Sequence, residues 1–445
     1  MRYPGYPDMK DSGIEWLGEV PAHWELSQLR RNANVSLSSV DKLSVAGEAL
    51  VRLCNYVDVY RSQKITHEAE FMSATATAQE IARFQLARGD VLITKDSETW
   101  DDIAVPSFIA EDLPGVLCGY HLAHIRPAAG LLDGEFLFRA FQAAPVNTQF
   151  QTAATGVTRF GLPASAIREA IFTVPPLPEQ RAIATFLDRK TQALDEVIRD
   201  KERLVEVLQE KRQALISQAV TKGLDPNVPM KDSGIEWLGE VPAHWTVAPL
   251  NMRYSVQLGK MLSPASLTGQ APLPYLRNVN IQWDRVDLAD VGEMDFSSAE
   301  RARLGLRSGD LLVCEGGEVG RTAIWRGEMS ECYYQKAVHR LRPKAACEVP
   351  RFLYYLLWTA AHRGVFVNEG NCATIVHLTA EKLRLHRFPF PPADEQNNIV
   401  RHLNAISSHT EQVEADMRTQ TDKLREYRQA LITAAVTGKI DVRGK

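Results

Sequence analysis

Few residues of this 445-residue chain stand in patterns that could do chemistry. The sequence holds no G-x-x-x-x-G-K-[ST] loop to cradle a phosphate and no H-E-x-x-H pair to bind zinc. The glycine-rich run 316–320, GGEVG, lacks the G-x-G-x-x-G spacing of a cofactor loop, so we interpret it as a turn after a strand. The eleven histidines and six cysteines show no metal-ligand spacing, and we expect reduced cysteines without a zinc or disulfide framework.

Two further patterns contain only part of a catalytic set. Asp90 with Lys95, and Asp310 with Glu315, do not supply the Asp…Glu-x-Lys set of a metal-dependent nuclease. An enzyme that methylates an exocyclic amine needs a polar residue before Pro-Pro and an aromatic residue after it. Residues 174–177 read VPPL and residues 390–393 read FPPA, and we interpret both as turns between a strand and a helix. The sequence therefore predicts no catalytic residue and no metal site.

The strongest signal is an internal repeat. Residues 9–24 and 230–245 share the same sixteen letters, MKDSGIEWLGEVPAHW. Each half also closes in the same way, with PPLPEQ and RQALISQAVTKG in the first half and PPADEQ and RQALITAAVTGK in the second. A period of about 220 residues is too long for a solenoid unit and indicates two similar domains in tandem. The interiors, 27–170 and 248–386, match only in fragments, as expected for two equivalent frames with different readout surfaces.

The repeated segment contains Trp16 and Trp24, with Trp237 and Trp245 in the second copy. Tryptophan in so short a motif belongs either to a core or to a partner contact. We favour the core, because duplication of the whole motif within one chain fits a shared structural socket.

Each proline pair is followed by a helical pattern of about 40 residues, which Gly223 with Pro226, or Gly438, brings to an end. The apolar seam positions are Leu187, Leu194, Val197, Leu204, Leu208 and Leu215 in the first segment and Leu403, Ile406, Val413, Met417, Leu424 and Leu431 in the second. We expect the two helices to pair as an antiparallel coiled coil, a rod of about 60 Å that holds two domains apart. Polar seam residues such as Lys190, Lys201, Thr410 and Gln420 would help to set the register. The alternative is two independent helices, each packed on its own domain.

The interiors read as α/β (α+β) or as mostly β. Glycine-led apolar runs at 89–95 and 309–315 predict strands, and helices are expected at 135–149 and 351–364. Short strands at 170–174 and 386–389 then lead into the proline pairs. The expected organisation is a pseudo-two-fold tandem. Its segments are a first globular domain at 1–174, a helical spacer at 175–223, a second globular domain at 224–390 and a distal helical spacer at 391–445.

The composition restricts the class of protein. With 45% hydrophobic and 24% charged residues, the chain has the composition of a folded protein. We find no run of 18 apolar residues and no apolar signal-peptide core, and so expect a cytoplasmic protein without a membrane partner. The formal net charge of -4, taken alone, argues against a nucleic-acid binder.

Together, the SGIEWLGEVPAHW openings, the PPLPEQ and PPADEQ entries, the long helices and the RQALI closers resemble the specificity subunit of a type I restriction-modification enzyme, over essentially the whole chain. The resemblance implies two target recognition domains, each reading one half of a bipartite, asymmetric site in double-stranded DNA. It implies that the helices set the half-site spacing and dock two methyltransferase subunits, which bind S-adenosylmethionine and methylate adenine N6. Restriction subunits would add ATP- and Mg-dependent translocation and cleavage. The specificity subunit itself would bind no cofactor and catalyse no reaction, and its acidity is acceptable because partner subunits can supply phosphate contacts.

Candidate site residues follow from side-chain chemistry and loop position. Base readout requires Arg, Lys, Asn, Gln, Ser or Thr on exposed loops, although each could equally be a solvated loop residue or a local cap. The DNA-binding candidates are Lys95, Thr155, Thr158 and Arg159 in the first domain and Arg321, Gln335, Lys336, Asn371 and Thr374 in the second. The candidates for docking the methyltransferase are Trp16, Gln180, Arg181, Trp237 and Gln396.

Two other functions remain open. The chain could be a coiled-coil scaffold that carries two ligand-binding heads and does not bind DNA. It could also be an enzyme with an unrecognised site between the heads. Heads that diverge while their frames repeat favour a DNA-specificity subunit over a scaffold, and the lack of a paired acid and base disfavours an enzyme.

Overall fold

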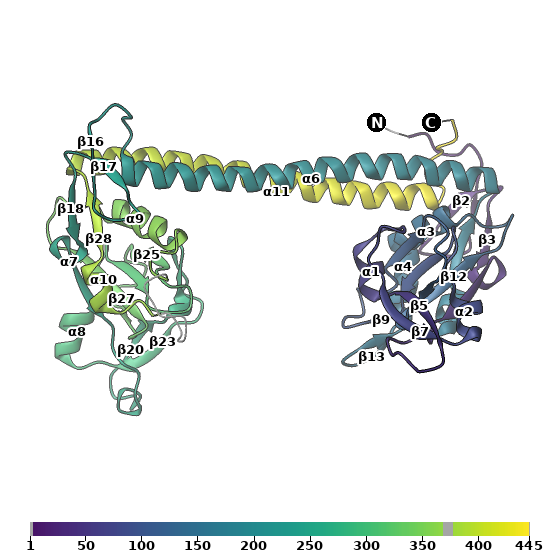
Figure 1. Cartoon of the computed structure of the whole chain (residues 1–445), viewed down its shortest axis with the longest axis horizontal. Helices are drawn as coiled ribbons and strands as arrows, with labels where there is room; N and C mark the ends of the chain where they lie inside the picture. Colours follow the sequence, from purple (N-terminus) through teal and green to yellow (C-terminus); the bar gives the residue numbers. More distant parts are fainter. Residues whose placement is uncertain (1–2, 368–376, 445) are drawn as a thin grey trace. The chain divides into compact units, whose positions relative to one another are not determined.

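The computed structural model describes residues 3–367 and 377–444, and these fall into two compact units. Unit 1 consists of residues 1–202 and 418–445, and unit 2 of residues 203–417. Each unit contains one globular head and parts of the two long helices α6 (Leu177–Lys222) and α11 (Ala393–Val436), which are drawn in Figure 1. The expected tandem of α/β heads with two long helices is therefore confirmed.

The head of unit 1 is built on two sheets. The central sheet has the order β4-β12-β8-β10-β6, with β4 Ala33–Leu37, β12 Leu122–Pro127, β8 Val91–Thr94, β10 Pro106–Ile109 and β6 Lys64–Ile65. The smaller sheet has the order β11-β5-β7, with β11 Val116–Cys118, β5 Ala49–Cys54 and β7 Met72–Ala76. Neighbouring strands of the central sheet are antiparallel, except for the parallel pair β10 and β6.

Strand β8 shows why this head needs two cores. Side chains alternate between the faces of a strand, so Val91 and Ile93 lie in a core with the helices, whereas Leu92 lies in the core shared with the smaller sheet. A strand buried on both faces reads as a continuous apolar run, which is what the sequence has here.

Unit 2 repeats this architecture. Its larger sheet has the order β19-β27-β24-β25, with β19 Tyr254–Leu258, β27 Val338–Pro343, β24 Leu311–Cys314 and β25 Thr322–Ile324. Its smaller sheet has the order β23-β20-β26, with β23 Gly292–Asp295, β20 Pro272–Leu276 and β26 Tyr333–Tyr334. Leu311 and Val313 face the helices and Leu312 faces the smaller sheet, as in β8. The two heads share a fold although their interiors differ in sequence.

Shorter elements complete the heads. In unit 1 these are β1 Met9–Asp11, β2 Glu19–Pro21, β3 Glu25–Gln28, α1 Tyr56–Arg61, α2 Ala78–Phe84, β9 Asp96–Ser97, α3 Gly134–Gln142, α4 Ala144–Ala153, β13 Thr155–Gly156, β14 Phe160–Gly161, α5 Ala164–Glu169 and β15 Ile171–Val174. In unit 2 these are β16 Met230–Asp232, β17 Glu240–Pro242, β18 Thr246–Pro249, α7 Leu250–Arg253, β21 Ile281–Gln282, β22 Arg285–Val286, α8 Ser298–Leu304, α9 Pro350–His362, α10 Ala380–Leu385 and β28 Arg387–Phe390.

The helix expected at 135–149 is two helices in the structure. Helix α3 ends at Gln142, Ala143 has an extended backbone (φ -72°, ψ 129°), and α4 begins at Ala144. Pro145 stands in the first turn of α4, where its missing N–H costs nothing, but in one continuous helix it would remove a hydrogen bond. The counterpart in unit 2, α9, has its proline at the first position and is continuous.

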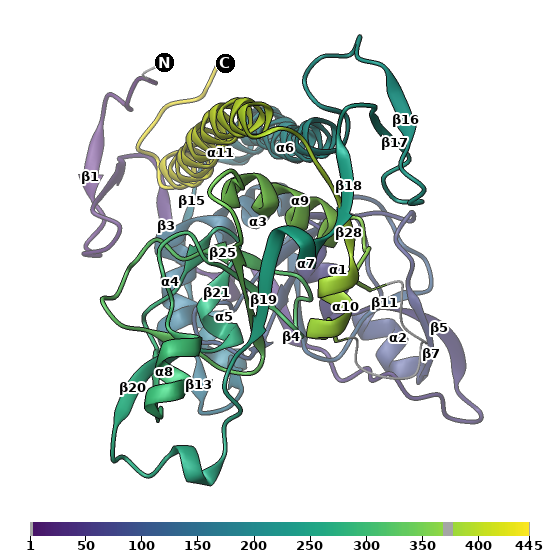
Figure 2. The same cartoon turned by 90° about the vertical axis from the view of Figure 1, so that its left-hand side faces the viewer.

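The repeated tryptophan motif packs on the end of a long helix in each unit. Trp24 is buried in unit 1 in one core with Ile432 and Ala435 of α11, and Trp245 is buried in unit 2 with Ala219 of α6. We call these two packing sites the sockets. Beside each socket the motif forms a hairpin, β1-β2 or β16-β17, which lies next to the long helices in Figure 2. The first socket joins the two ends of the chain, and the N–H of Asp441 donates to the carbonyl of Pro4 (2.8 Å).

Polar contacts show that α6 and α11 pair antiparallel in each unit. In unit 1 Arg428 donates two hydrogen bonds to Asp195, of 2.8 and 3.2 Å, and in unit 2 Arg212 donates one to Glu411, of 2.7 Å. These ion pairs are equivalent under the internal repeat, because the same offset separates 212 from 428 and 195 from 411. The expected antiparallel pairing is thus present, with matching contacts in the two units.

The seam differs from the predicted one along one of its two lines. One of the two sets of predicted seam positions, the set that contains Leu187 and Leu194, is buried or half-buried throughout. Its apolar members are Leu187, Leu194, Leu208, Leu215, Leu403, Met417, Leu424 and Leu431. The other line lies one residue further along. Val197 and Leu204 are 43% and 44% exposed, whereas Ile198 is 9% exposed. Ile406 and Val413 are half-buried, and the buried residues beside them are Ser407 and Glu414.

The physical reason is the width of the apolar stripe. A wide apolar stripe on a helix is compatible with two choices of seam positions, one residue apart. Contact with the second helix decides which of the two sets of positions is buried. Here contact buries several polar residues, among them Thr191, Ser407, Glu414 and Thr421. One expected polar seam contact is present, since Lys201 donates to Gln420 across the pair at 2.7 Å.

Candidate nucleic-acid interface

Three loops of unit 1 meet at one edge of its central sheet. Lys95, the residue that leaves β8, donates its backbone N–H to the carbonyl of His121 (3.0 Å). Its own carbonyl accepts from the N–H of Leu162 (2.8 Å). The loop after β8, the loop before β12 and the segment before α5 are therefore joined through the backbone of one residue.

Unit 2 has the same three-loop edge. Glu315 leaves β24, donates its N–H to the carbonyl of Ala337 (3.0 Å) and accepts from the N–H of Leu378 (2.8 Å). Lys95 and Glu315 occupy equivalent places, so the two edges share a backbone frame and carry opposite charges. Backbone bonds do not depend on the side chain, and the exposed side chains at these edges are therefore free to differ between the heads.

The side chain of Lys95 is already engaged in unit 1. Its ammonium donates to Asp96 at 2.7 Å and lies over the ring of Tyr120, 4.8 Å from its centre. His121 also bonds to Asp96 at 2.7 Å, with its backbone in the left-handed region (φ 52°). Burial opposes ionisation of Asp96, but the hydrogen bonds from Lys95 and His121 outweigh it and lower the pKa of this carboxyl. Lys95 therefore organises the edge, and only 12% of its side chain is exposed.

The other candidates of unit 1 lie on an exposed hairpin beside this cluster. Strand β14 pairs with both β13 and β9, and Phe160 and Gly161 lie opposite Ser97 and Asp96. This pairing brings the candidate hairpin alongside the segment that follows Lys95. Thr155, Thr158 and Arg159 are all exposed.

The candidates of unit 2 lie at the corresponding edge. Arg321 is largely buried, donates to Glu318 (3.2 Å) and to the carbonyl of Asn278 (3.0 Å), and so supports the turn after β24. Gln335 is half-buried and Lys336 is exposed. Both directly precede Ala337, whose carbonyl accepts the hydrogen bond from the N–H of Glu315. The candidates Asn371 and Thr374 lie outside the described residues.

The acidic residues that matched part of a nuclease set are structural. Asp90 accepts two hydrogen bonds from Arg126, of 2.8 and 2.7 Å, and Asp310 accepts two from Arg342, of 2.7 and 2.6 Å. Both carboxyls are 1% exposed. Burial opposes ionisation of Asp90, but Arg126 and His124 outweigh it and lower its pKa. Each pair fastens the turn before the central strand to its neighbouring strand.

Two of the docking candidates are buried and serve the heads themselves. Gln180 is 0% exposed; it accepts from the N–H of Asp133 (2.7 Å) and donates to the carbonyl of Pro175 (2.8 Å). Gln396 is 2% exposed and makes the equivalent bonds to Val349 and Pro391, of 3.2 and 3.0 Å. These glutamines tie the start of each long helix to the preceding head, and their side chains are not open to a partner.

The remaining docking candidates are accessible. Trp16 is 40% exposed at the tip of its hairpin, and Trp237 is half-buried against the ring of Phe388. The side chain of Arg181 is 66% exposed and lies 3.7 Å from the carboxylate of Asp133.

Sequence reasoning missed a group of residues beside the exposed hairpin. Tyr56, Tyr60, Glu98 and Asp102 line the same cavity as Thr158 and Arg159. Two tyrosines on a short helix usually indicate core packing, but Tyr60 is 47% exposed. The acidic residues were overlooked because the search for DNA contacts was restricted to basic, amide and hydroxyl side chains.

No group of three or more His, Cys, Asp or Glu side chains in ranges 3–367 and 377–444 is placed to hold a metal ion. In the same ranges no helix combines the length and the apolar character needed to cross a bilayer.

Comparisons with known proteins agree on one family. The family model for the type I restriction modification DNA specificity domain matches residues 304–420. A Methanocaldococcus jannaschii protein assigned as the specificity subunit of type I restriction enzyme MjaX is 22% identical over 449 residues, which cover 96% of each chain. The Escherichia coli EcoBI specificity subunit is 23% identical over 299 residues, which cover 64% of this chain and 62% of that subunit.

Solved structures show the same fold. A chain from a study of complex assembly and conformational transition in the type I R-M system superposes with a TM-score of 0.71 at 16% identity, covering 95% of this chain and 99% of that one. The HsdS subunit of Thermoanaerobacter tengcongensis gives a TM-score of 0.54 at 17% identity, with 95% and 98% covered. In its family-model match, its relatives and its fold, the chain is similar to the DNA specificity subunits of type I restriction-modification enzymes.

Proposed function

We propose that this chain is the DNA sequence-specificity subunit of a type I restriction-modification complex and that each head reads one half of a bipartite, asymmetric site. The observation that carries the proposal is the pair of three-loop edges. The same backbone bonds hold Lys95 in one head and Glu315 in the other. Two equal frames with different side chains suit the reading of two different sequences.

The charges at these edges favour contacts with bases. Phosphates attract lysine and arginine, yet in unit 1 Lys95 is neutralised by Asp96, and in unit 2 the equivalent residue is acidic. Base edges offer both donors and acceptors, which acidic, basic and hydroxyl side chains can all match. Phosphate contacts that set affinity would then come largely from partner subunits. This division of roles explains a DNA-reading chain with a net charge of -4.

We assign the docking of the methyltransferase to the two hairpins. Packing in the sockets explains why buried residues such as Trp24 and Trp245 are the same in the two copies of the motif. It does not explain why exposed residues of the motif are also the same. The exposed residues identical in the two copies include Glu15, Glu19 and Ala22, with Glu236, Glu240 and Ala243 as counterparts. One surface present twice in a chain suits a partner present in two copies. Trp16 and Trp237 lie on these hairpins and are the docking residues we retain, together with Arg181.

The rest of the proposed complex follows from this role. Segments 1–174 and 224–390 would read DNA, and segments 175–223 and 391–445 would set the spacing between half-sites. Two methyltransferase subunits would supply S-adenosylmethionine and transfer its methyl group to adenine N6. Restriction subunits would supply ATP- and Mg-dependent translocation and cleavage in the cytoplasm. This chain would position these partners on the DNA and catalyse no step itself.

The test is a map of N6-methyladenine across the genome by single-molecule sequencing. We expect one bipartite motif whose methylation disappears when the gene for this chain is deleted. Exchange of residues 27–170 for those of another family member should change one half of the motif only. Persistence of every bipartite motif after deletion would refute the specificity role, and a change in both halves would refute separate reading by the two heads.

A further inference from the structure

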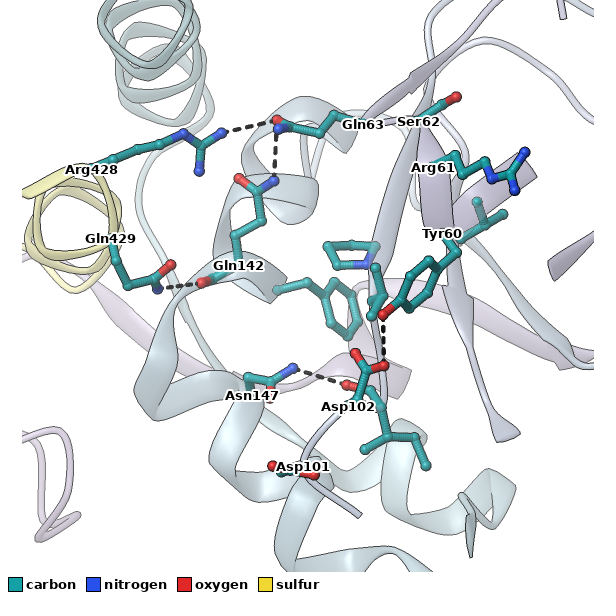
Figure 3. A pocket seen from close by; sticks show the side chains of 15 residues that line it. Tyr60, Arg61, Ser62, Gln63, Asp101, Asp102, Gln142, Asn147, Arg428 and Gln429 are labelled. Atoms are coloured by element: carbon teal, nitrogen blue, oxygen red, sulfur yellow. Dashed lines mark hydrogen bonds between the residues drawn. The ribbon is translucent and has the colours of Figure 1, made fainter. Parts of the chain in front are cut away.

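The exposed hairpin of unit 1 borders a cavity of 880 Å³. Its walls include Tyr56 and Tyr60, whose rings stack with centres 5.6 Å apart and an angle of 15° between their planes. The hydroxyl of Tyr60 donates to Asp102 at 2.7 Å, a bond that Figure 3 shows from the side of the neighbouring cavity. Arg159 also lines this cavity. The cavity thus has a rigid aromatic wall, and its rim carries both basic and acidic groups.

The strand pairing brings two of these groups to one cavity. In the antiparallel pair of β14 and β9, Phe160 lies opposite Ser97, and Arg159 and Glu98 flank this pair just outside the two strands. Both residues also line the same cavity. Within the described part of the chain, neither the guanidinium of Arg159 nor the carboxylate of Glu98 has a hydrogen-bond or ion-pair partner. A donor fork and an acceptor therefore border one cavity, both exposed.

We infer that Arg159 and Glu98 together read one G·C base pair in the major groove, with Arg159 donating to guanine N7 and O6 and Glu98 accepting from cytosine N4. Guanine presents two acceptors there, and its partner cytosine presents an amino donor. The two side chains offer the complementary pattern from one edge. The inference rests on the proposed DNA-reading function and deepens it by assigning a base pair to the first head.

The surroundings disfavour other occupants of this edge. Asp96 is neutralised by Lys95, but Glu98 and Asp102 also border the cavity, and their negative charge repels a phosphate. A bound metal ion is disfavoured too, since these carboxylates are not grouped at ligand distance among the described residues. An exocyclic amino group carries no full charge but donates hydrogen bonds, so it fits an acidic rim.

The experiment uses the full methyltransferase complex assembled with this chain. The bipartite motif is mapped for the wild type, and exchange of 27–170 identifies the half read by the first head. Arg159→Ala and Glu98→Gln are then compared with Arg88→Ala and Glu70→Gln, which change exposed residues of the same head that do not line the cavity. We expect both test variants to relax the same G·C position of that half-site, and both controls to keep the wild-type motif.

Binding to synthetic duplexes supplies a second measurement. Arg159→Ala should weaken binding to the motif by about 5- to 150-fold, and the wild type should lose a similar factor when 7-deazaguanine removes the N7 acceptor at that position. The variant should be indifferent to the same change in the DNA. An unchanged motif in both test variants would overturn the inference while leaving the DNA-reading function intact. An equal loss on all sequences with a smaller salt dependence would overturn it as well, because it would mark a phosphate contact. A wild type with no bipartite motif would overturn the proposed function, and the inference with it.

Discussion

Replacing Gly438 with alanine should weaken the socket of unit 1 much more than the matching change at Gly223 weakens that of unit 2. Both glycines follow the end of a long helix and have left-handed backbones, with φ of 72° and 78°. An L-residue in that conformation costs about 1–2 kcal/mol, and this cost is common to both substitutions. The difference arises from the neighbouring atoms. A Cβ at 438 would lie 2.6 Å from Cγ of Pro21, closer still to its Cδ, and 3.1 Å from Trp24.

At 223 the nearest atoms belong to Trp245 and Glu395, both at 3.4 Å, which is ordinary van der Waals contact. The ring of Pro21 is rigid and cannot turn aside, so overpacking at 438 should add about 1–3 kcal/mol. Gly438→Ala should therefore cost about 2–5 kcal/mol of local stability, and Gly223→Ala about 1–2 kcal/mol.

Hydrogen exchange followed by mass spectrometry measures both sockets in one sample. Peptides around Trp24 report on unit 1, and peptides around Trp245 report on unit 2, so each variant carries its own control. The expected difference of about 1–3 kcal/mol corresponds to roughly 5- to 150-fold faster exchange at the affected socket. Equal acceleration of the two sockets by their respective variants would refute the reasoning, because the steric contact with Pro21 would then contribute nothing.

Three further changes test contacts within each unit. Reversing Arg428 to glutamate should destabilise unit 1 by about 1–3 kcal/mol, and adding Asp195→Arg should restore part of the loss; a double-mutant cycle in urea measures the coupling, and a coupling near zero would contradict the observed pairing. Asp90→Asn should cost about 1–3 kcal/mol at neutral pH, because Arg126 loses its ion pair and keeps only its hydrogen bond to the carbonyl of Gln85; because the pKa of Asp90 is lowered by folding, its stabilisation is present above its ordinary pKa near 4 and is lost as the pH falls, so the variant should show a flatter loss of stability in acid. Burial lowers the pKa of His339, so the unfolded chain takes up this proton first and stability should fall as the pH drops below about 6.5; thermal unfolding of His339→Gln between pH 7.5 and 5.5 should show a weaker pH dependence than the wild type.

The architecture was predictable from the sequence because the sequence contains an internal repeat. Duplication of the tryptophan motif and of the RQALI closers indicated two frames, and the glycines after each helix marked its end. The burial of Trp24 and Trp245 follows from the same signal. What remained hidden depends on contacts between distant residues. Glu414 lies in the seam and is only 9% exposed. Its burial depends on which residues of the other helix contact it, and no local sequence pattern contains that information.

The candidate interface was predictable only in part. Lys95 and Arg159 were chosen as basic residues on loops, and the strand pairing brings their segments together. Their roles differ, because Lys95 forms an ion pair with Asp96, whereas Arg159 is exposed on a hairpin. Periodicity cannot show this, because it contains no information on which loop meets which. Gln180 shows a second limit: a polar residue at a helix start suggested a partner contact, and the sequence could not show that its side chain is buried and bonded inside the head.

The way in which the reading edges are held bears on how specificity could change. The backbone of Lys95 or Glu315 joins three loops, and the buried pairs Asp90–Arg126 and Asp310–Arg342 fasten the adjoining strands. None of the backbone bonds requires a particular side chain at the edge. Under the proposed function, a substitution there would alter which base is matched and would leave the frame, the sockets and the helix contacts as they were. Such a fold can exchange one half of its recognition sequence without adjusting the surfaces that its partners contact, and the divergence of two heads within one chain is what this separation permits.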